Sequence, residues 1–266
     1  MGSLVQPLEV NATYIGGPTL LLEVAGLRLL TDPTFDPAGS SYPAGGIVLR
    51  KRSGPALAVE DLGPIDAVLL SHDHHFDNLD HAGRLLLAKV PAIFTTESGA
   101  SRLGAGATGL APWASAPLAT PSGEALRITA TPARHGPAGF EHASGEVIGF
   151  LVSLGAGGGG RALAYITGDT VWYEGIAEVS RRSDPSAVFL HGGAAQPRGP
   201  FNMTMNTNDA IETARAFPRA RIIPLHHEGW EHNTQDAGDL ATAFAAVGMR
   251  ERLQVLAPGV AVRLAL

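Results

Sequence analysis

The chain has 266 residues, of which 45% are hydrophobic and 17% charged, and its formal net charge is -6. This length and composition are typical of a compact globular protein and exclude a largely disordered one. The net negative charge of the chain argues against nucleic acid as a partner, because proteins that bind phosphate groups usually carry a basic surface patch. Cysteine is absent, which excludes disulfides, thiolate metal ligands and a cysteine nucleophile.

The N-terminal segment shows no targeting signal. The opening MGSLVQPLEV lacks the basic and apolar regions of a secretory signal peptide. No apolar run reaches the roughly 18 residues expected of a membrane-spanning helix. We therefore expect a cytoplasmic protein without a membrane span. The densest basic stretch, residues 50–52, is interpreted as a solvated loop.

The first part of the chain predicts short strands joined by turns. Apolar runs at 20–24 and 27–30 flank Ala25-Gly26, which is a hairpin signal, and Pro33 ends ladder pairing after the second run. The next expected elements are a strand at 67–70, a helix at 80–89 and a strand at 92–95.

The second part alternates strands and helices without a clear linker. The expected strands are 126–131, 147–154, 162–167, 187–190 and 221–224, and the tail at 253–266 is extended. The expected helices are 171–180, 206–217 and 236–247. The glycine run 157–160 is interpreted as a hairpin tip. This mixture favours a layered α/β architecture with polar residues at the ends of strands, where loops carry function.

The most informative stretch follows the predicted strand at 67–70. Residues 72–80 contain three histidines and three aspartates. Neutral imidazole and carboxylate are ligands that suit zinc, and also manganese or iron. A turn allows side chains two or three residues apart to converge on one ion. The alternative is a polar surface turn that binds no metal.

Three further candidate ligands follow predicted strands. His135 comes after the strand at 126–131, Asp169 after the strand at 162–167, and His226 after the strand at 221–224. Each has a structural alternative when taken alone, because a histidine can serve as a hydrogen-bonding residue and an aspartate can cap the next helix. Four ligand-bearing strand ends in this order indicate a metal centre.

This order of ligand types resembles the metallo-β-lactamase superfamily. The closer resemblance is to the branch that contains L-ascorbate-6-phosphate lactonase-like and N-acylphosphatidylethanolamine phospholipase D-like proteins. Segments 14–19 and 29–33 are similar to the opening hairpin and the aspartate-proline turn of that branch. The resemblance extends from about Tyr14 to His232. It implies a four-layer αββα sandwich, with the metal site at one edge between the sheets, and we expect a single domain over residues 1–266.

The resemblance also implies a set of ligands. His72 matches the first histidine of the family's His-x-His-x-Asp-His loop, and one inserted residue brings His75 and Asp77 onto later positions of that loop. His74 remains the alternative to His75. In the family pattern His135 completes the first metal site, Asp169 is the carboxylate that bridges the two ions, and His226 completes the second site. The implied metal ligands are His72, His75, Asp77, His135, Asp169 and His226.

Asn78 is the main departure from the family pattern, because it stands where the loop has its last histidine. An amide oxygen is a weaker ligand for a transition metal than imidazole, so a second ion is expected to bind weakly or not at all. Asp73 is a candidate replacement from the same turn. Asp32 is interpreted either as a partner that orients a ligand histidine or as a cap of the turn before Pro33.

Other residues near these motifs have open assignments. His191 ends a predicted strand and is either structural or a proton donor that faces the cleft. Trp230 either packs in the core or forms a pocket wall. His142 and His232 lie in polar loops and receive no role.

The resemblance implies a metal-dependent hydrolase that holds one or two zinc ions, with manganese or iron as alternatives. A metal-activated water attacks a small ester, lactone or phosphodiester, and Asp77 is the expected catalytic residue that orients this water or accepts its proton. No Gly-x-Ser-x-Gly motif offers a serine nucleophile. The expected partner is therefore a small molecule and not nucleic acid. Two alternatives remain: a metal-binding module without catalysis, and a nuclease of the same superfamily.

Overall fold

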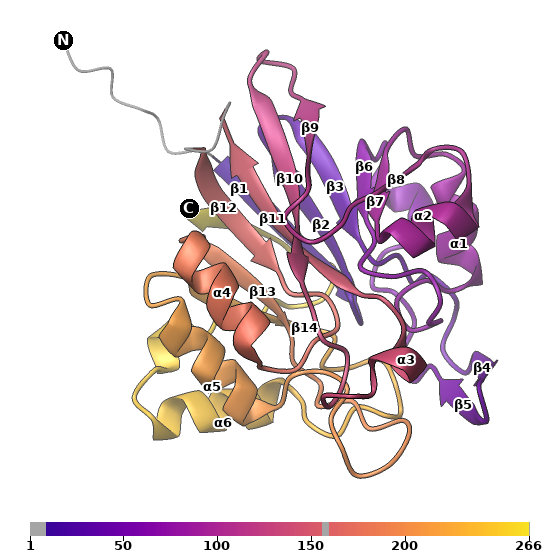
Figure 1. The fold of residues 1–266 in the computed structure, drawn as a ribbon, viewed down its shortest axis with the longest axis vertical. Helices are drawn as coiled ribbons and strands as arrows, with labels where there is room; N and C mark the ends of the chain where they lie inside the picture. Colours follow the sequence, from indigo (N-terminus) through magenta and orange to yellow (C-terminus); the bar gives the residue numbers. More distant parts are fainter. Residues whose placement is uncertain (1–8, 156–159, 266) are drawn as a thin grey trace.

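Two β-sheets that pack face to face form the centre of the molecule in the computed structural model, which describes residues 9–155 and 160–265 (Figure 1). The first sheet has the strand order β15-β1-β2-β3-β6-β7-β8. Its strands are β1 (Glu9–Gly16), β2 (Thr19–Val24), β3 (Leu27–Thr31), β6 (Ala67–Leu69), β7 (Ile93–Thr95), β8 (Ala107–Gly109) and β15 (Ala261–Ala265).

The second sheet has the strand order β14-β13-β12-β11-β10-β9. Its strands are β9 (Ser115–Ala119), β10 (Ala125–Pro132), β11 (Ile148–Leu154), β12 (Arg161–Ile166), β13 (Ala187–His191) and β14 (Arg221–Leu225). The remaining strands, β4 (Ser41–Ala44) and β5 (Ile47–Arg50), form a separate hairpin, which we call the flap.

Helices cover the outer faces of both sheets (Figure 1). Beside the first sheet lie α1 (His81–Leu87) and α2 (Glu97–Leu103). Beside the second lie α4 (Glu174–Arg182), α5 (Thr207–Ala216) and α6 (Ala237–Ala246). Three short elements complete the described chain: α3 (Glu141–Ser144) and the 3-10 helices at Val59–Leu62 and Arg250–Arg252. No helix in these described ranges is long and apolar enough to cross a membrane.

Three buried apolar clusters separate the layers. Between the sheets, alternate residues of β2 such as Leu20 and Leu22 pack with Ile128 and Phe150 of the second sheet. The intervening Leu21 faces the other way, toward the cluster that α1 completes. A third cluster joins the second sheet to α4, α5 and α6. Because successive side chains of a strand point to opposite faces, each sheet contributes to two clusters. The predicted four-layer αββα sandwich is confirmed.

Most predicted elements lie within a few residues of the observed ones. Ala25 and Gly26 both have positive φ, as a two-residue hairpin turn of mirror-image type requires, and they join β2 to β3 as predicted. The sequence did not predict β1, β8, β9, α2, α3 or the flap. The expected hairpin tip at 157–160 lies almost wholly outside the described residues.

The flap is held against the body of the protein by aromatic side chains. Tyr42 of β4 stacks on Phe76 with ring centroids 4.8 Å apart, and it also contacts Trp230 at 5.7 Å. Leu49 completes this cluster. Trp230 is only 1% exposed, so it packs in a core beneath the flap.

A buried ion pair ties the end of the flap to the start of α1. Lys51 is 5% exposed, and its Nζ lies 2.9 Å from Oδ2 of the fully buried Asp80. The Asp80 carboxylate also caps α1 and accepts the backbone N–H groups of Phe35, Asp36 and Gly83. The prediction that residues 50–52 form a solvated loop is therefore wrong for Lys51. Its burial follows from a partner distant in sequence.

We predict that Asp80→Asn lowers the free energy of unfolding by about 3–5 kcal/mol, because it leaves the Lys51 ammonium buried without a counter-charge. Urea unfolding measures this loss. The matched control is Asp184→Asn, which removes the partner of Arg219 from an exposed pair and is expected to cost about 0–1 kcal/mol. Equal losses in the two variants would contradict the structural role of the buried pair.

Candidate metal centre

The predicted ligands lie in loops at one end of the sandwich, each after the carboxyl end of a strand. The 72–80 loop follows β6, and the other loops follow β10, β12 and β14. Strand β12 is parallel to β13, which is parallel to β14, so their loops emerge from the same edge. This shared direction brings together side chains that are up to 154 positions apart, from His72 to His226.

Two overlapping groups of potential ligand atoms share Asp169. The donors of His72, His135 and Asp169 lie within 4.8 Å of one another, and so do those of Asp77, Asp169 and His226. Asp169 Oδ2 is 3.7 Å from His135 Nε2, and Asp169 Oδ1 is 3.8 Å from His226 Nε2. Donors around a tetrahedral zinc ion with bonds of about 2.0–2.1 Å lie roughly 3.4 Å apart, so both spacings suit an ion.

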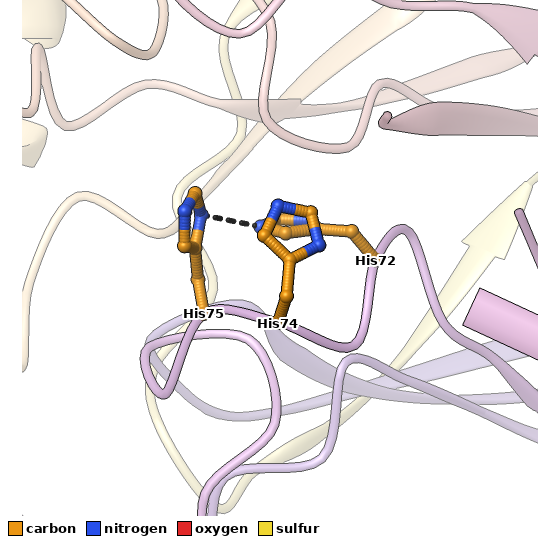
Figure 2. A group of neighbouring side chains, drawn as sticks. All are labelled: His72, His74 and His75. Atoms are coloured by element: carbon orange, nitrogen blue, oxygen red, sulfur yellow. Dashed lines mark hydrogen bonds between the residues drawn. The ribbon is translucent and has the colours of Figure 1, made fainter. Parts of the chain in front are cut away.

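His74 and His75 both lie close to His72, as Figure 2 shows. His72 Nε2 is 3.0 Å from His75 Nδ1, and the His75 ring lies 5.1 Å from that of His135. His74 instead places its Nε2 2.7 Å from the carbonyl oxygen of Ser144. The half-buried His74 thus has one ring nitrogen held by the chain near α3 and the other without a hydrogen-bond partner among the described residues, so it remains the alternative to His75.

Unpartnered polar atoms test whether the cluster suits a cation. Asp169 Oδ2, both ring nitrogens of His226 and His191 Nε2 are buried without a hydrogen-bond partner among the described residues. Each such atom costs about 1–3 kcal/mol when nothing replaces the lost water. A divalent ion bound by either group would give its unpartnered carboxylate and imidazole atoms a partner. The donor set therefore fits a metal site.

Hydrogen bonds to the outer nitrogens orient the ligand rings. Ser71 Oγ lies 2.9 Å from His72 Nδ1, and the carbonyl oxygen of Met203 accepts from His135 Nδ1 at 2.8 Å. Both contacts engage Nδ1, so that Nε2 faces the cluster, toward His75 in the case of His72 and toward Asp169 in the case of His135. Metal-binding histidines are commonly fixed in this way through the nitrogen that does not bind the ion.

Asp32 holds the start of the ligand loop. It is buried, has a φ of +29°, and its Oδ1 accepts the backbone N–H of Ser71 at 2.7 Å. Its hydrogen bond goes to the backbone beside His72 and not to a ligand ring, so it stabilises the loop itself. Gly and Asp tolerate such a left-handed conformation better than bulkier residues.

Asp73 and Asn78 do not supply an obvious extra ligand. The Asp73 carboxylate is bound by Arg102 of α2, whose Nε lies 2.9 Å from Oδ2, so the suggestion that it joins the second site is not supported. Asn78 is fully buried and points its amide nitrogen toward Ser71 Oγ at 3.5 Å.

His226 reaches the site through a strained backbone. Its φ is +52°, in the left-handed region, and its N–H donates to the carbonyl oxygen of Gly17 at 2.7 Å. A non-glycine residue in that region costs about 1–3 kcal/mol and persists only where its surroundings fix it. The bend directs the side chain from the end of β14 toward Asp77 and Asp169.

The local electrostatics favour the metal-binding protonation states of His72, His75 and Asp77, whereas, despite burial, Asp169 and Asp77 raise the pKa of His226. Burial lowers the pKa of His72 well below its usual range, and it lowers the pKa of His75 to about 3 with help from the nearby His135. Burial raises the pKa of Asp77, but His226 and His232 outweigh it and hold that pKa well below the usual value. At neutral pH the imidazoles of His72 and His75 are neutral and the carboxyl of Asp77 is ionised, so metal binding requires no proton release from them.

Two histidines at the site were not assigned from the sequence. His191 Nδ1 lies 2.8 Å from Asp169 Oδ1 behind the cluster, which makes it a positioning partner of that carboxylate. His232 Nε2 lies 3.0 Å from Asp77 Oδ2. The sequence signal for His232 was only its position six residues after His226, in a loop that contains Trp230.

Comparisons with known proteins identify the family of the chain. A family model described as the beta-lactamase superfamily domain matches residues 27–227. The chain belongs to the metallo-β-lactamase superfamily. It is 30% identical over 226 residues to a UPF0173 metal-dependent hydrolase of Opitutus terrae, covering 82% of this chain and 84% of the relative. It is 25% identical over 255 residues to the UPF0173 protein YddR of Bacillus subtilis, covering 92% and 96%.

A solved structure extends the comparison to the fold. The isothiocyanate hydrolase from Delia radicum gut bacteria superimposes with a TM-score of 0.80 at 25% identity, covering 96% of this chain and 100% of that one. The chain is a metal-dependent hydrolase of the UPF0173 family. The predicted superfamily and the predicted enzyme class are confirmed. The narrower assignment to the lactonase-like branch stays a prediction.

We predict that His135→Ala and Asp169→Ala each lower the metal content of the purified protein, because each removes a donor from a buried group. Elemental analysis of equal protein amounts measures this. His142→Ala is the matched control, since His142 is exposed on α3 and lies outside both groups. Unchanged metal content in both site variants would contradict the assignment of His135 and Asp169 as metal ligands.

Proposed function

We propose that this enzyme hydrolyses a small, largely apolar ester or lactone at a zinc centre, with manganese or iron as alternative ions. The observation that carries the proposal is a cavity that opens directly on the candidate ligands His75, Asp77 and His135. The flap and the segment after β13 form its walls. The wall residues are Ala44, Ile47, Leu49, Ala195, Pro197, Arg198 and Met203.

The lining of this cavity restricts the substrate class. Six of the seven wall side chains are apolar, and Arg198 is the one cation among them, with its Nη1 3.1 Å from the carbonyl oxygen of Gly45. Apolar walls favour burial of hydrocarbon next to the reacting group. A single guanidinium and a net charge of -6 do not suit a polyanion, which argues against the nuclease alternative. The same reasoning ranks an ester or lactone above a phosphodiester.

The chain's own residues position the reactants. A divalent ion held by these residues lowers the pKa of a bound water from 15.7 toward about 7 and polarises the substrate oxygen. His72, His75 and His135 would hold the first ion, and Asp169, which belongs to both groups of donors, would contribute to the binding of each ion. Asp77 lines the cavity as an ionised carboxylate, so it can accept a hydrogen bond from the attacking water and fix its direction.

An isothiocyanate is the second candidate substrate. The isothiocyanate hydrolase from Delia radicum gut bacteria covers 96% of this chain at 25% identity. The central carbon of an isothiocyanate is electrophilic, like an ester carbonyl carbon, and the apolar side chains that line the cavity match a hydrocarbon substituent in polarity. We further propose that residues 1–266 act as a single catalytic domain, because the ligand groups draw on both sheets.

We predict metal-dependent turnover of at least one small ester, lactone or isothiocyanate in a panel that also contains phosphodiesters. The protein is stripped with a chelator and reloaded with zinc, manganese or iron before the assay. Asp77→Asn is expected to lower kcat by about 100-fold or more, because an oriented carboxylate typically contributes this much. His142→Ala is the control. Metal-loaded protein without turnover of any member, or turnover of phosphodiesters alone, would reject the proposed substrate class.

The flap supplies a test of the cavity. Ile47 lines the cavity, whereas its neighbour Val48 is 51% exposed on the other face of β5. We predict that Ile47→Ala raises KM about tenfold with a smaller effect on kcat, since lost apolar contact costs about 1–3 kcal/mol of binding. Val48→Ala is expected to change neither constant. Equal effects of the two substitutions would show that the cavity wall does not contact the substrate.

A further inference from the structure

We propose that His232 is a protein ligand of the second metal ion and replaces the imidazole that the family's loop carries where this chain has Asn78. The proposal rests on the metal-dependent hydrolase assigned above and extends it to a residue outside the family's ligand pattern. Without such a residue, the second group consists of Asp77, Asp169 and His226, one imidazole short of that pattern.

Two imidazoles converge on one oxygen of Asp77. His226 Nε2 lies 3.7 Å from Asp77 Oδ2, and His232 Nε2 lies 3.0 Å from the same oxygen. The two rings are nearly perpendicular, with centroids 6.4 Å apart. His232 therefore approaches the second group from a different side than His226, as separate ligands of one ion do.

The ring nitrogens of His232 have no other use in the described structure. Its side chain is 7% exposed, its Nε2 lies 3.0 Å from Asp77 Oδ2, and neither ring nitrogen makes a well-aligned hydrogen bond there. Neither ring nitrogen of His226 does so either, whereas both ring nitrogens of His72 and Nδ1 of His135 have hydrogen-bond partners. A buried imidazole without a well-aligned hydrogen bond is unfavourable unless an ion takes up its lone pair.

The fold holds His232 at this position. Its carbonyl oxygen accepts the backbone N–H of Gln196 at 2.8 Å, and its ring lies 6.0 Å from that of Trp230 at an interplanar angle of 32°. Trp230 is itself fixed beneath the flap by its backbone bridge to Lys51. The loop after β14 thus returns to the metal centre through a packed residue.

Asn78 does not compete for the same role. Its amide nitrogen is directed toward Ser71, and its oxygen is neutral and a weaker ligand than imidazole. The change from histidine to asparagine in the loop is therefore compensated by an imidazole from the loop after β14.

Metal stoichiometry tests the proposal without an activity assay. Wild type, His232→Ala, His232→Gln and the exposed control His142→Ala are stripped and titrated with cobalt(II), with visible absorption and elemental analysis as readouts. We expect two ions per chain in wild type and in His142→Ala, and one ion in both His232 variants. His232→Gln retains an N–H donor near Asp77, so it separates coordination from a hydrogen bond to that carboxylate.

Several results would overturn the assignment: two ions in His232→Gln, a single ion in wild type, or loss of both ions from the His232 variants. The last result would mean that His232 supports the whole centre and not the second ion. Failure of the proposed function has a different signature, namely wild-type protein that binds no metal, or that binds two ions and turns over no substrate.

Discussion

The carboxylate of Asp169 lies fully buried among three imidazoles, and the geometry of the candidate metal centre depends on keeping that charge in place. Burial raises the pKa of Asp169, but His226, His191 and His135 together lower it below the usual value. An isolated buried carboxylate would be expensive, so these contacts, and a bound cation, are what make the position tolerable. Asp169 follows β12 of the second sheet, while Asp77 and His72 follow β6 of the first. The site therefore joins the two sheets as well as performing chemistry.

Two other aspartates fix the ligand loop at its ends. Asp32 binds the backbone N–H of Ser71 where the loop begins, and Asp80 caps α1 where the loop ends. Nine residues held at both ends lose much of their conformational freedom before any ion binds. Their side chains are thus oriented in advance, which lowers the entropy cost of metal binding.

The sequence predicted the candidate ligands that directly follow strands, because an apolar run with a polar residue after it can be recognised in the sequence itself. His135, Asp169 and His226 are of this kind, and the structure places them together. His232 and Lys51 were missed for the opposite reason: a loop histidine and a basic triplet look solvated until Asp77 and Asp80 are found beside them. The flap carried no strong signal, since its strands have four residues each and pack on Trp230, far along the chain. That residues 1–266 form one domain stays a prediction.

The ion pair between Lys51 and Asp80 has a consequence for how this enzyme can change its substrate. The base of the flap and the end of the 72–80 loop share the carboxylate of Asp80, so a mutation that repositions the whole flap also disturbs the loop that carries the candidate ligands. Side chains near the flap tip, such as Ile47, line the cavity beyond that shared anchor. Side-chain changes at the tip can therefore alter the cavity wall without disturbing the ion pair that anchors the base of the flap.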